Sequence, residues 1–221
     1  MASATILERQ AAASSTPRDR IVIITLSASS VITLLACTHC LKVRWVLESM
    51  GLRYRLVGID LHDNKPQWYL GLNPKGTTPA AWMRGEFYPE SGDILAAVVA
   101  LAAGNEAAVG DAGRSFASRS ARDEVQSQVK GLVGSAFGVL LSDPETDSDH
   151  ETKSEKLRLA LAKIDGELSS SGPYACGAGP GVLDAEAILH SVILGALEKL
   201  CPWLSLSSDY PSVARWIDLV G

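Results

Sequence analysis

The chain has 221 residues, a hydrophobic content of 47% and a formal net charge of -5 at pH 7. This length can bury one sizeable core or two small ones, so neither disulfides nor a metal is needed for stability. Because the sequence has no block of lysine or arginine, we expect neither nucleic acid nor an anionic membrane surface as a partner. Four cysteines without regular spacing do not form a secreted disulfide framework, and they indicate a reducing compartment.

The N-terminal part of the chain contains a long uncharged run. Residues 1–20 are small and polar and predict a disordered extension, whereas residues 21–41 carry no formal charge and allow a signal anchor as an alternative. A serine-rich break over residues 27–30 divides this run into two β-branched segments, which we interpret as buried strands. We therefore expect no stable membrane insertion and a cytoplasmic protein, and organelle targeting by the extension stays open.

Strand and helix patterns alternate in the next part of the chain. Val43, Val46, Leu47 and Met50 recur at helical spacing and predict a helix that stops at Gly51. A strand is expected over residues 54–61, a short helix over 65–72 and a hairpin over 79–91. Together with the strand after residue 20, this gives the order β-α-β-(α)-β-β, which is an α/β arrangement.

The character of the sequence changes after residue 92. Alanine- and leucine-rich stretches predict five helices, over residues 92–103, 116–141, 152–170, 183–200 and 209–219. The acidic stretch over residues 142–156 is interpreted as a solvated turn, because it lacks the glycine and the ligand spacing of a calcium-binding loop. We therefore predict an α/β domain over residues 21–95 and an all-helical domain over residues 105–221.

A pair of cysteines, Cys37 and Cys40, lies where a strand is expected to end and a helix to begin. Backbone N–H groups and the helix dipole at that position favour a thiolate over a thiol, which would make Cys37 a nucleophile. Cys40 lies one helical turn further on the same face and could resolve a mixed disulfide. The residues alone leave a second interpretation open, in which both cysteines are inert core thiols.

A metal site at these cysteines is a weaker hypothesis. Cys37, His39 and Cys40 lie within four residues, so their side chains diverge, and a structural zinc site needs a second cluster of ligands. The other two cysteines, Cys176 and Cys201, lie far along the chain. We expect no bound metal.

Five segments of the sequence together resemble the cytosolic glutathione transferase superfamily. They are, in chain order, "CTHCLKVRWVLESMGLRY", "NKPQWYLGLNPKGTTPA", "FYPESGDIL", "LDAEAIL" and "YPSVARWIDLV". The resemblance extends from about residue 30 to the end and implies a thioredoxin-like domain followed by an all-helical domain. The cysteine at the start of the first segment is similar to that of the omega, lambda and dehydroascorbate reductase classes.

The resemblance also implies a set of glutathione-binding residues. Thr78 and Pro79 would form a cis peptide, with the main chain of Thr78 pairing with the cysteinyl part of glutathione. Lys65 resembles the lysine that binds the glycyl carboxylate. Glu90 and Ser91 stand at a strand end and a helix start, where they suit the γ-glutamyl ammonium and carboxylate groups. A plain N-cap serine is the alternative for Ser91.

The sequence departs from the family pattern at two places. Thr38 and His39 follow Cys37, where thiol-type members carry proline and an aromatic residue, so Thr38 is an alternative group for activating glutathione. Gly181 stands where the family has a hydroxyl residue three positions before Asp184. Asp184 is therefore expected to cap a buried helix alone.

The sequence thus predicts a glutathione-dependent thiol transferase or reductase, with glutathione as cosubstrate, that acts through Cys37 on mixed disulfides or small oxidised substrates such as dehydroascorbate. Glutathione conjugation of electrophiles and a non-catalytic interaction module are the alternatives. The resemblance implies a homodimer. Residues of the helical domain would line the pocket for the second substrate. The small residues of that domain, Gly131, Gly134, Ser135 and Gly138, allow either close helix packing or a cleft there.

Overall fold

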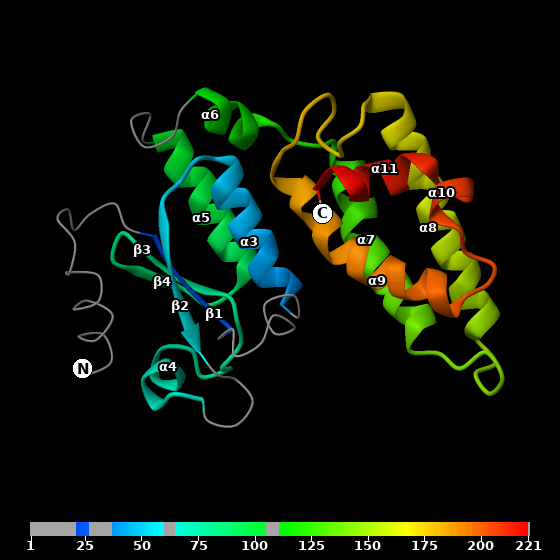
Figure 1. Cartoon of the computed structure of the whole chain (residues 1–221), viewed down its shortest axis with the longest axis horizontal. Coiled ribbons are helices and arrows are strands. Elements are labelled where there is room, and N and C mark those ends of the chain that lie inside the picture. The colour runs from blue at the N-terminus through cyan, green and yellow to red at the C-terminus, as the bar shows by residue number, and fades with distance from the viewer. Residues whose placement is uncertain (1–20, 27–36, 60–64, 105–110, 221) are drawn as a thin grey trace. The chain divides into compact units, whose positions relative to one another are not determined.

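The computed structural model describes residues 21–26, 37–59, 65–104 and 111–220. The expected N-terminal extension over residues 1–20 and the second apolar segment over residues 30–36 lie outside the described residues. The chain divides into two compact units, Met1–Arg114 and Ser115–Gly221, which Figure 1 shows with their helices and strands labelled.

The first unit is built on a four-stranded sheet. Its strands are β1 (Ile21–Leu26), β2 (Tyr54–Ile59), β3 (Ala80–Met83) and β4 (Glu86–Tyr88), arranged in the order β2-β1-β3-β4. Strand β1 runs parallel to β2 and antiparallel to β3, which continues into the β3–β4 hairpin. The expected order of strands and helices in this part of the chain is therefore confirmed, as is the thioredoxin-like arrangement that the resemblance implied.

Helices cover the sheet of the first unit. Ile23 is paired with Ala81 across the strands and both side chains are fully buried, on the face where α5 (Ser91–Gly104) contacts β3. Helix α3 (Thr38–Ser49) lies beside α5 (Figure 1). Helix α4 (Gln67–Leu72) buries Tyr69 in a separate cluster with Ile59 and Ala80.

Helix α3 forms and ends as its sequence predicts. Its core-facing residues Val43, Val46 and Leu47 are fully buried, at the spacing that places them on one helical face. The helix ends at Met50, and Gly51 follows with a φ of 66°, in the left-handed region that glycine enters without steric cost.

The first unit extends further along the chain than the limit at residue 95 expected from the sequence. Helix α5 belongs to it, because Ile94, Leu95 and Val98 are buried where this helix packs on α3 and the β3–β4 hairpin. Helix α6 (Asp111–Ser118) then runs across the boundary between the two units.

The second unit consists of helices within the residues described. They are α7 (Asp123–Leu140), α8 (His150–Ser171), the short 3-10 helix η1 (Val182–Ala185), α9 (Glu186–Leu200), α10 (Leu206–Asp209) and α11 (Pro211–Val220). Helix α7 packs against α8 and α9, and α11 packs against α8, α9 and α10. The fold class predicted from the sequence, an α/β domain followed by an all-helical domain, is confirmed.

One helix was predicted with the wrong boundaries. The sequence favoured a single helix over residues 116–141, whereas α6 ends at Ser118 and α7 begins only at Asp123. A long-range contact accompanies the break, because the Arg119 guanidinium donates a hydrogen bond of 3.1 Å to the carbonyl oxygen of Pro180. Two acidic residues, Asp123 and Glu124, then occupy the first turn of α7, where they complement its dipole.

Candidate active site at the start of helix α3

Cys37 occupies the N-cap position of α3, as the sequence predicted. Its carbonyl oxygen accepts hydrogen bonds from the backbone N–H groups of Cys40 and Leu41, at 3.0 and 3.1 Å. Its Sγ lies 3.3 Å from the N–H of Cys40, so that the sulfur accepts a hydrogen bond from the first turn of the helix. Once the sulfur is reduced, this contact would stabilise a thiolate, because the N–H and the helix dipole both present positive charge to it.

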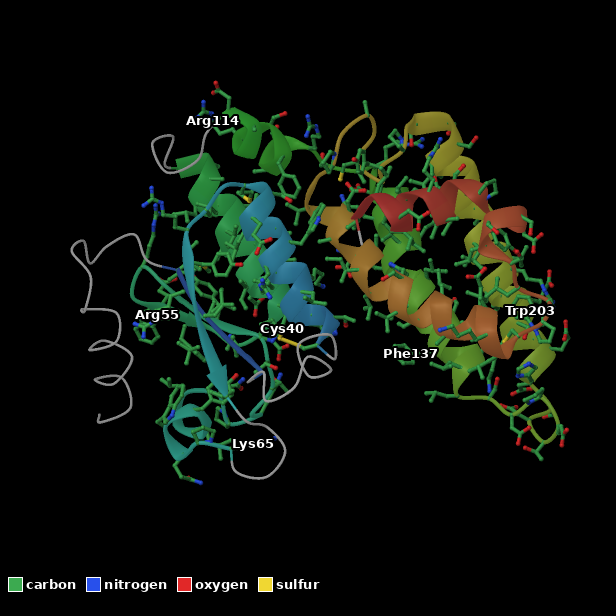
Figure 2. The ribbon with its side chains drawn as sticks, in the orientation of Figure 1. Cys40, Arg55, Lys65, Arg114, Phe137 and Trp203 are labelled. Carbon is green, nitrogen blue, oxygen red and sulfur yellow. A yellow bond between two sulfur atoms is a disulfide. The ribbon has the colours of Figure 1, made fainter. Side chains whose placement is uncertain are left out.

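The sulfur atoms of Cys37 and Cys40 are joined in a disulfide, with the two Cα atoms 5.2 Å apart (Figure 2). Cys37 is half-buried, whereas Cys40 is only 3% exposed. The two cysteines therefore differ in access: after reduction, Cys37 is the one that a substrate can reach, and Cys40 lies behind it. His39, between them, is exposed.

The loop that precedes β3 lies against Cys37. The Thr78–Pro79 peptide bond is cis, as the resemblance implied. The carbonyl oxygen and the Oγ1 atom of Thr78 both lie 3.8 Å from the Sγ of Cys37. The structure thus brings together two of the residues singled out in the sequence, from positions 41 residues apart.

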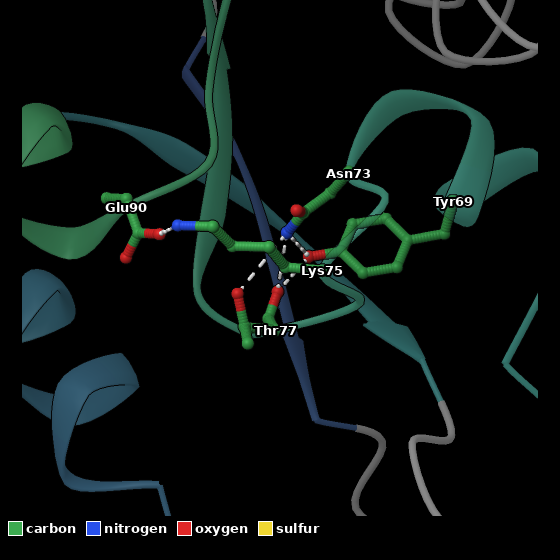
Figure 3. A network of polar contacts seen from close by, with 5 residues as sticks. All are labelled: Tyr69, Asn73, Lys75, Thr77 and Glu90. Atoms are coloured by element: carbon green, nitrogen blue, oxygen red, sulfur yellow. Dashed lines mark hydrogen bonds and ion pairs between the residues drawn. The ribbon is translucent and has the colours of Figure 1, made fainter.

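A buried network of hydrogen bonds, shown in Figure 3, holds this loop in place. The Asn73 side-chain amide donates hydrogen bonds to the hydroxyl of Tyr69, at 3.1 Å, and to the carbonyl oxygen of Thr77, at 3.0 Å. The Tyr69 hydroxyl donates to the same carbonyl oxygen. Tyr69 is fully buried and Asn73 is 2% exposed, so these bonds form away from solvent. These residues all lie in the segment "NKPQWYLGLNPKGTTPA", but their hydrogen bonds were not foreseen from it.

Glu90 and Ser91 stand at the start of α5, as the sequence predicted. The Ile94 N–H donates to the Glu90 carbonyl oxygen at 3.0 Å, which makes Glu90 the N-cap residue and Ser91 the first residue of the helix. Ser91 is half-buried and lies where unpaired backbone N–H groups of the first turn can receive an anion.

Lys75 is a residue of this region that the sequence analysis missed. Its Nζ lies 2.7 Å from Oε1 of Glu90 (Figure 3), with 70% of the Lys75 side chain and 49% of the Glu90 side chain exposed. The hydrogen bond to Glu90 raises the pKa of Lys75, so its ammonium group is charged at neutral pH. Its place within the "NPKGTTP" loop was visible in the sequence, but its partner was not.

Lys65 lies against the same loop. Its side chain is exposed, and its Cδ and Nζ atoms cover Gly76 so closely that a Cβ added there would meet them at 3.0 and 3.1 Å. Gly76 has a φ of 62°, in the region that favours glycine. Lys65 and Glu90 thus both lie beside the loop over residues 73–79.

A second polar centre, with a structural character, lies in the helical unit. Asp184 is fully buried, and its carboxylate accepts hydrogen bonds from the N–H of Ala175, the N–H of Gly181 and the indole of Trp216, at 2.6, 2.8 and 2.8 Å. Asp184 therefore caps η1 without a hydroxyl at position 181, as expected. The contribution of Trp216, 32 residues away, was not foreseen.

Cys176 lies beside this aspartate. A Cβ at Gly181 would lie only 2.6 Å from the Sγ of Cys176, so the thiol fills the space where a larger residue at 181 would place its side chain. Burial, and then the neighbouring Asp184 carboxylate, raise the pKa of the Cys176 thiol to about 12. Burial also raises the pKa of Cys201. These two thiols stay protonated at neutral pH, unlike a sulfur at a helix start.

The small residues of α7 face a groove. Nothing lies within 4 Å of a Cβ built on Gly131 or Gly134, and pockets of about 300 and 370 Å³ lie between this face and side chains of α8. The lining residues from α8 include Lys153 and Lys156. These small residues therefore border open grooves beside α8, although α7 and α8 also pack against each other.

In the described part of the chain, no group of three or more His, Cys, Asp or Glu side chains lies close enough together to hold a metal ion. None of the described helices combines the length and the apolar character needed to cross a membrane.

The fold and part of the sequence are similar to those of a known class of protein. Residues 36–100 match the family model for "Glutathione S-transferase, N-terminal domain", and the whole described chain has the fold of the glutathione transferases. The resemblance to that superfamily is thereby confirmed.

Individual relatives give a finer comparison. The chain is 32% identical over 62 residues to glutathione S-transferase DHAR3, chloroplastic, of Arabidopsis thaliana; the match spans 28% of this chain and 24% of that protein. The structure is similar to that of dehydroascorbate reductase from Chlamydomonas reinhardtii, with a TM-score of 0.67 and 21% identity over 90% of this chain and 86% of that one. It is also similar to the trimeric glutathione transferase TDR1 of Leishmania, with a TM-score of 0.64, 22% identity, and coverage of 90% of this chain and 42% of that one.

Proposed function

We propose that this protein is a glutathione-dependent thiol transferase or reductase whose nucleophile is Cys37. The observation that carries the proposal is the position of the Cys37 sulfur, which accepts the Cys40 N–H at the start of α3 and faces Thr78 of the cis-proline loop. A thiolate held in this way can attack a disulfide and is also a good leaving group.

In the first step, the Cys37 thiolate attacks one sulfur of a glutathione mixed disulfide. A bond forms between Cys37 and the glutathione sulfur, the original disulfide bond breaks, and the other partner leaves as a thiolate that takes up a proton. The substrate is reduced by this exchange and Cys37 becomes glutathionylated.

In the second step, a thiol resolves the adduct. A glutathione thiolate can attack the adduct, which releases oxidised glutathione and restores the Cys37 thiolate. Cys40 offers a second route: its sulfur attacks Cys37, glutathione leaves as a thiolate, and the Cys37–Cys40 disulfide forms, which two further molecules of glutathione reduce. The observed pairing of these two sulfurs supports the role of Cys40 as resolving cysteine.

Glutathione binding is assigned to the residues around the loop before β3. We propose that Lys65 binds the glycyl carboxylate, that the main chain of Thr78, held by cis Pro79, pairs with the cysteinyl part, and that Glu90 and Ser91 bind the γ-glutamyl end. All five residues belong to the first unit.

The relatives indicate the type of second substrate and the setting. The name of the Chlamydomonas reinhardtii relative supports dehydroascorbate as a substrate, whose reduction to ascorbate oxidises two molecules of glutathione to the disulfide. We propose a homodimer in the cytoplasm, with an organelle as the alternative location because the Arabidopsis relative is chloroplastic.

One sequence of assays tests the proposed function. The protein should be retained on immobilised glutathione, should reduce a glutathione mixed disulfide and dehydroascorbate, and should conjugate chlorodinitrobenzene slowly. Conjugation without reduction would instead favour Thr38 as the activating group. Failure to bind glutathione would leave the non-catalytic interaction module.

A further inference from the structure

The start of α5 contains acidic residues, whose negative charge is unfavourable for binding an anion. The backbone carbonyl of Glu90 accepts the first hydrogen bond of the helix and Asp93 lies in its first turn, so two acidic residues belong to the helix end that would attract an anionic ligand. A ligand carboxylate that approaches Ser91 is therefore attracted by the backbone and repelled by these side chains.

Lys75 supplies the positive charge at this point. Its ammonium group is 2.7 Å from Glu90, and the charge of Asp93 also acts on it and raises its pKa.

We propose that Lys75 and Glu90 form a paired charge site for an amino-acid head group, in which Lys75 binds the α-carboxylate of a γ-glutamyl ligand and Glu90 binds its α-ammonium. The inference rests on the proposed function and adds Lys75 to it as a specificity-determining residue. A ligand head group carries its two opposite charges on one carbon atom, so it can lie against the ion pair with each charge facing its opposite.

The structure holds the backbone of Lys75 and leaves its side chain movable. On either side of Lys75, Asn73 and Thr77 are tied together by the buried amide, and Gly76 takes up the left-handed turn between them. The ion pair itself is exposed, and such a pair contributes little to stability. Lys75 can therefore exchange part of its contact with Glu90 for a ligand carboxylate at little cost to the fold.

The Lys75–Glu90 pair also lies close in the chain to Thr78. Lys75 and Thr78 are three residues apart in one loop, so their Cα atoms are at most about 11 Å apart. Thr78 in turn lies 3.8 Å from the Cys37 sulfur. One loop would thus hold both the head group of the ligand, through Lys75, and the segment that carries its thiol, through Thr78.

The test measures how each variant binds three tripeptides by calorimetry. The probes are glutathione, 4-aminobutyryl-Cys-Gly, which lacks only the α-carboxylate, and glutaryl-Cys-Gly, which lacks only the α-amino group. We expect Lys75→Met to weaken glutathione binding about tenfold, the loss typical of one charge-assisted hydrogen bond. It should leave the affinity for 4-aminobutyryl-Cys-Gly nearly unchanged, because that ligand has no carboxylate for Lys75 to bind.

We expect the opposite selectivity when Glu90 is changed instead of Lys75. Glu90→Gln should weaken glutathione binding to a similar extent and leave the affinity for glutaryl-Cys-Gly nearly unchanged. Lys75→Arg should keep most of the affinity for glutathione, since it keeps the charge. Lys130→Met, which removes an exposed lysine from α7, is the matched control and should bind all three peptides like the wild type.

Two outcomes overturn the inference and leave the proposed function intact. One is that Lys75→Met weakens glutathione and 4-aminobutyryl-Cys-Gly equally, which would mean that Lys75 acts only on the shape of the loop. The other is that Lys75→Met binds glutathione as well as, or better than, the wild type, which would mean that Lys75 competes with the ligand for Glu90. If the wild-type protein binds no glutathione, the proposed function itself fails and this inference fails with it.

Discussion

The Sγ atom of Cys37 lies 3.8 Å from the carbonyl oxygen of Thr78, although 41 residues separate them in the sequence. This contact joins the start of α3 to the loop before β3. A peptide ligand that pairs with the main chain of Thr78 would carry its own sulfur past Cys37, which is the geometry that disulfide exchange requires.

Replacing Cys37, the proposed nucleophile, should affect the reaction and not the binding of glutathione. Cys37→Ser is expected to abolish reduction of mixed disulfides and to leave glutathione affinity largely intact, because serine keeps the size of the side chain without a reactive thiolate. Cys40→Ser is the matched control and should keep most of the activity, since glutathione can resolve the adduct. A Cys37→Ser enzyme with most of its reductase activity would show that another group is the nucleophile.

The four cysteines should differ sharply in reactivity once the Cys37–Cys40 disulfide is reduced. At near-neutral pH, Cys37 should be alkylated by iodoacetamide well before the others, and glutathione should protect it. Cys176 and Cys201 should react slowly, because their raised pKa values keep them as thiols until the pH is well above neutral. Peptide mapping by mass spectrometry measures this order.

Equal labelling of Cys37 and Cys40 would contradict the assignment of a single nucleophile. The purified protein should also contain no stoichiometric zinc. A bound zinc whose removal unfolds the chain would instead support the metal hypothesis.

The pKa of Cys176 also predicts a pH dependence of stability. Because its pKa in the folded protein, about 12, is above the ordinary value of 9.0, the folded state holds this proton more tightly than the unfolded state. Its contribution is therefore complete below pH 9 and is lost as the pH rises towards 12. Cys176→Ala should show a smaller loss of melting temperature over this window than the wild type, and an identical loss would contradict the prediction.

Ser91 should contribute to ligand binding and little to folding. Ser91→Ala is expected to weaken glutathione binding a few-fold, because it removes one hydroxyl donor beside the first turn of α5. Its melting temperature should stay close to that of the wild type, since Glu90 and not Ser91 caps the helix. Unchanged affinity in calorimetry would remove Ser91 from the binding site.

Asp184 and Trp216 should be coupled in stability. Asp184→Ala leaves three buried donors without an acceptor and should cost about 3–5 kcal/mol of unfolding free energy. Trp216→Phe removes one donor and some buried surface and should cost less. In a double-mutant cycle of urea unfolding, the two changes should cost less together than the sum of the single changes, and strict additivity would argue against their hydrogen bond.

Local sequence patterns determined most of the fold. The helix α3 ends where Gly51 permits a left-handed residue, and the β3–β4 hairpin turns at Arg84 and Gly85, which both have positive φ. These features depend on residues that are neighbours in the chain, so they can be read from it. The same holds for the position of Cys37 at a helix start, from which its proposed role as nucleophile is argued.

Only the tertiary structure decided which distant residues meet. The Lys75–Glu90 pair spans 15 residues, the Asp184–Trp216 hydrogen bond 32, and the end of α6 coincides with a contact from Arg119 to Pro180. Helical propensity continues through residues 119–122, yet the chain leaves the helix there, because contacts formed in the folded unit outweigh the small differences in propensity. Local interactions thus determined which helices and strands form. Long-range packing determined where these elements end and which charged side chains pair with each other.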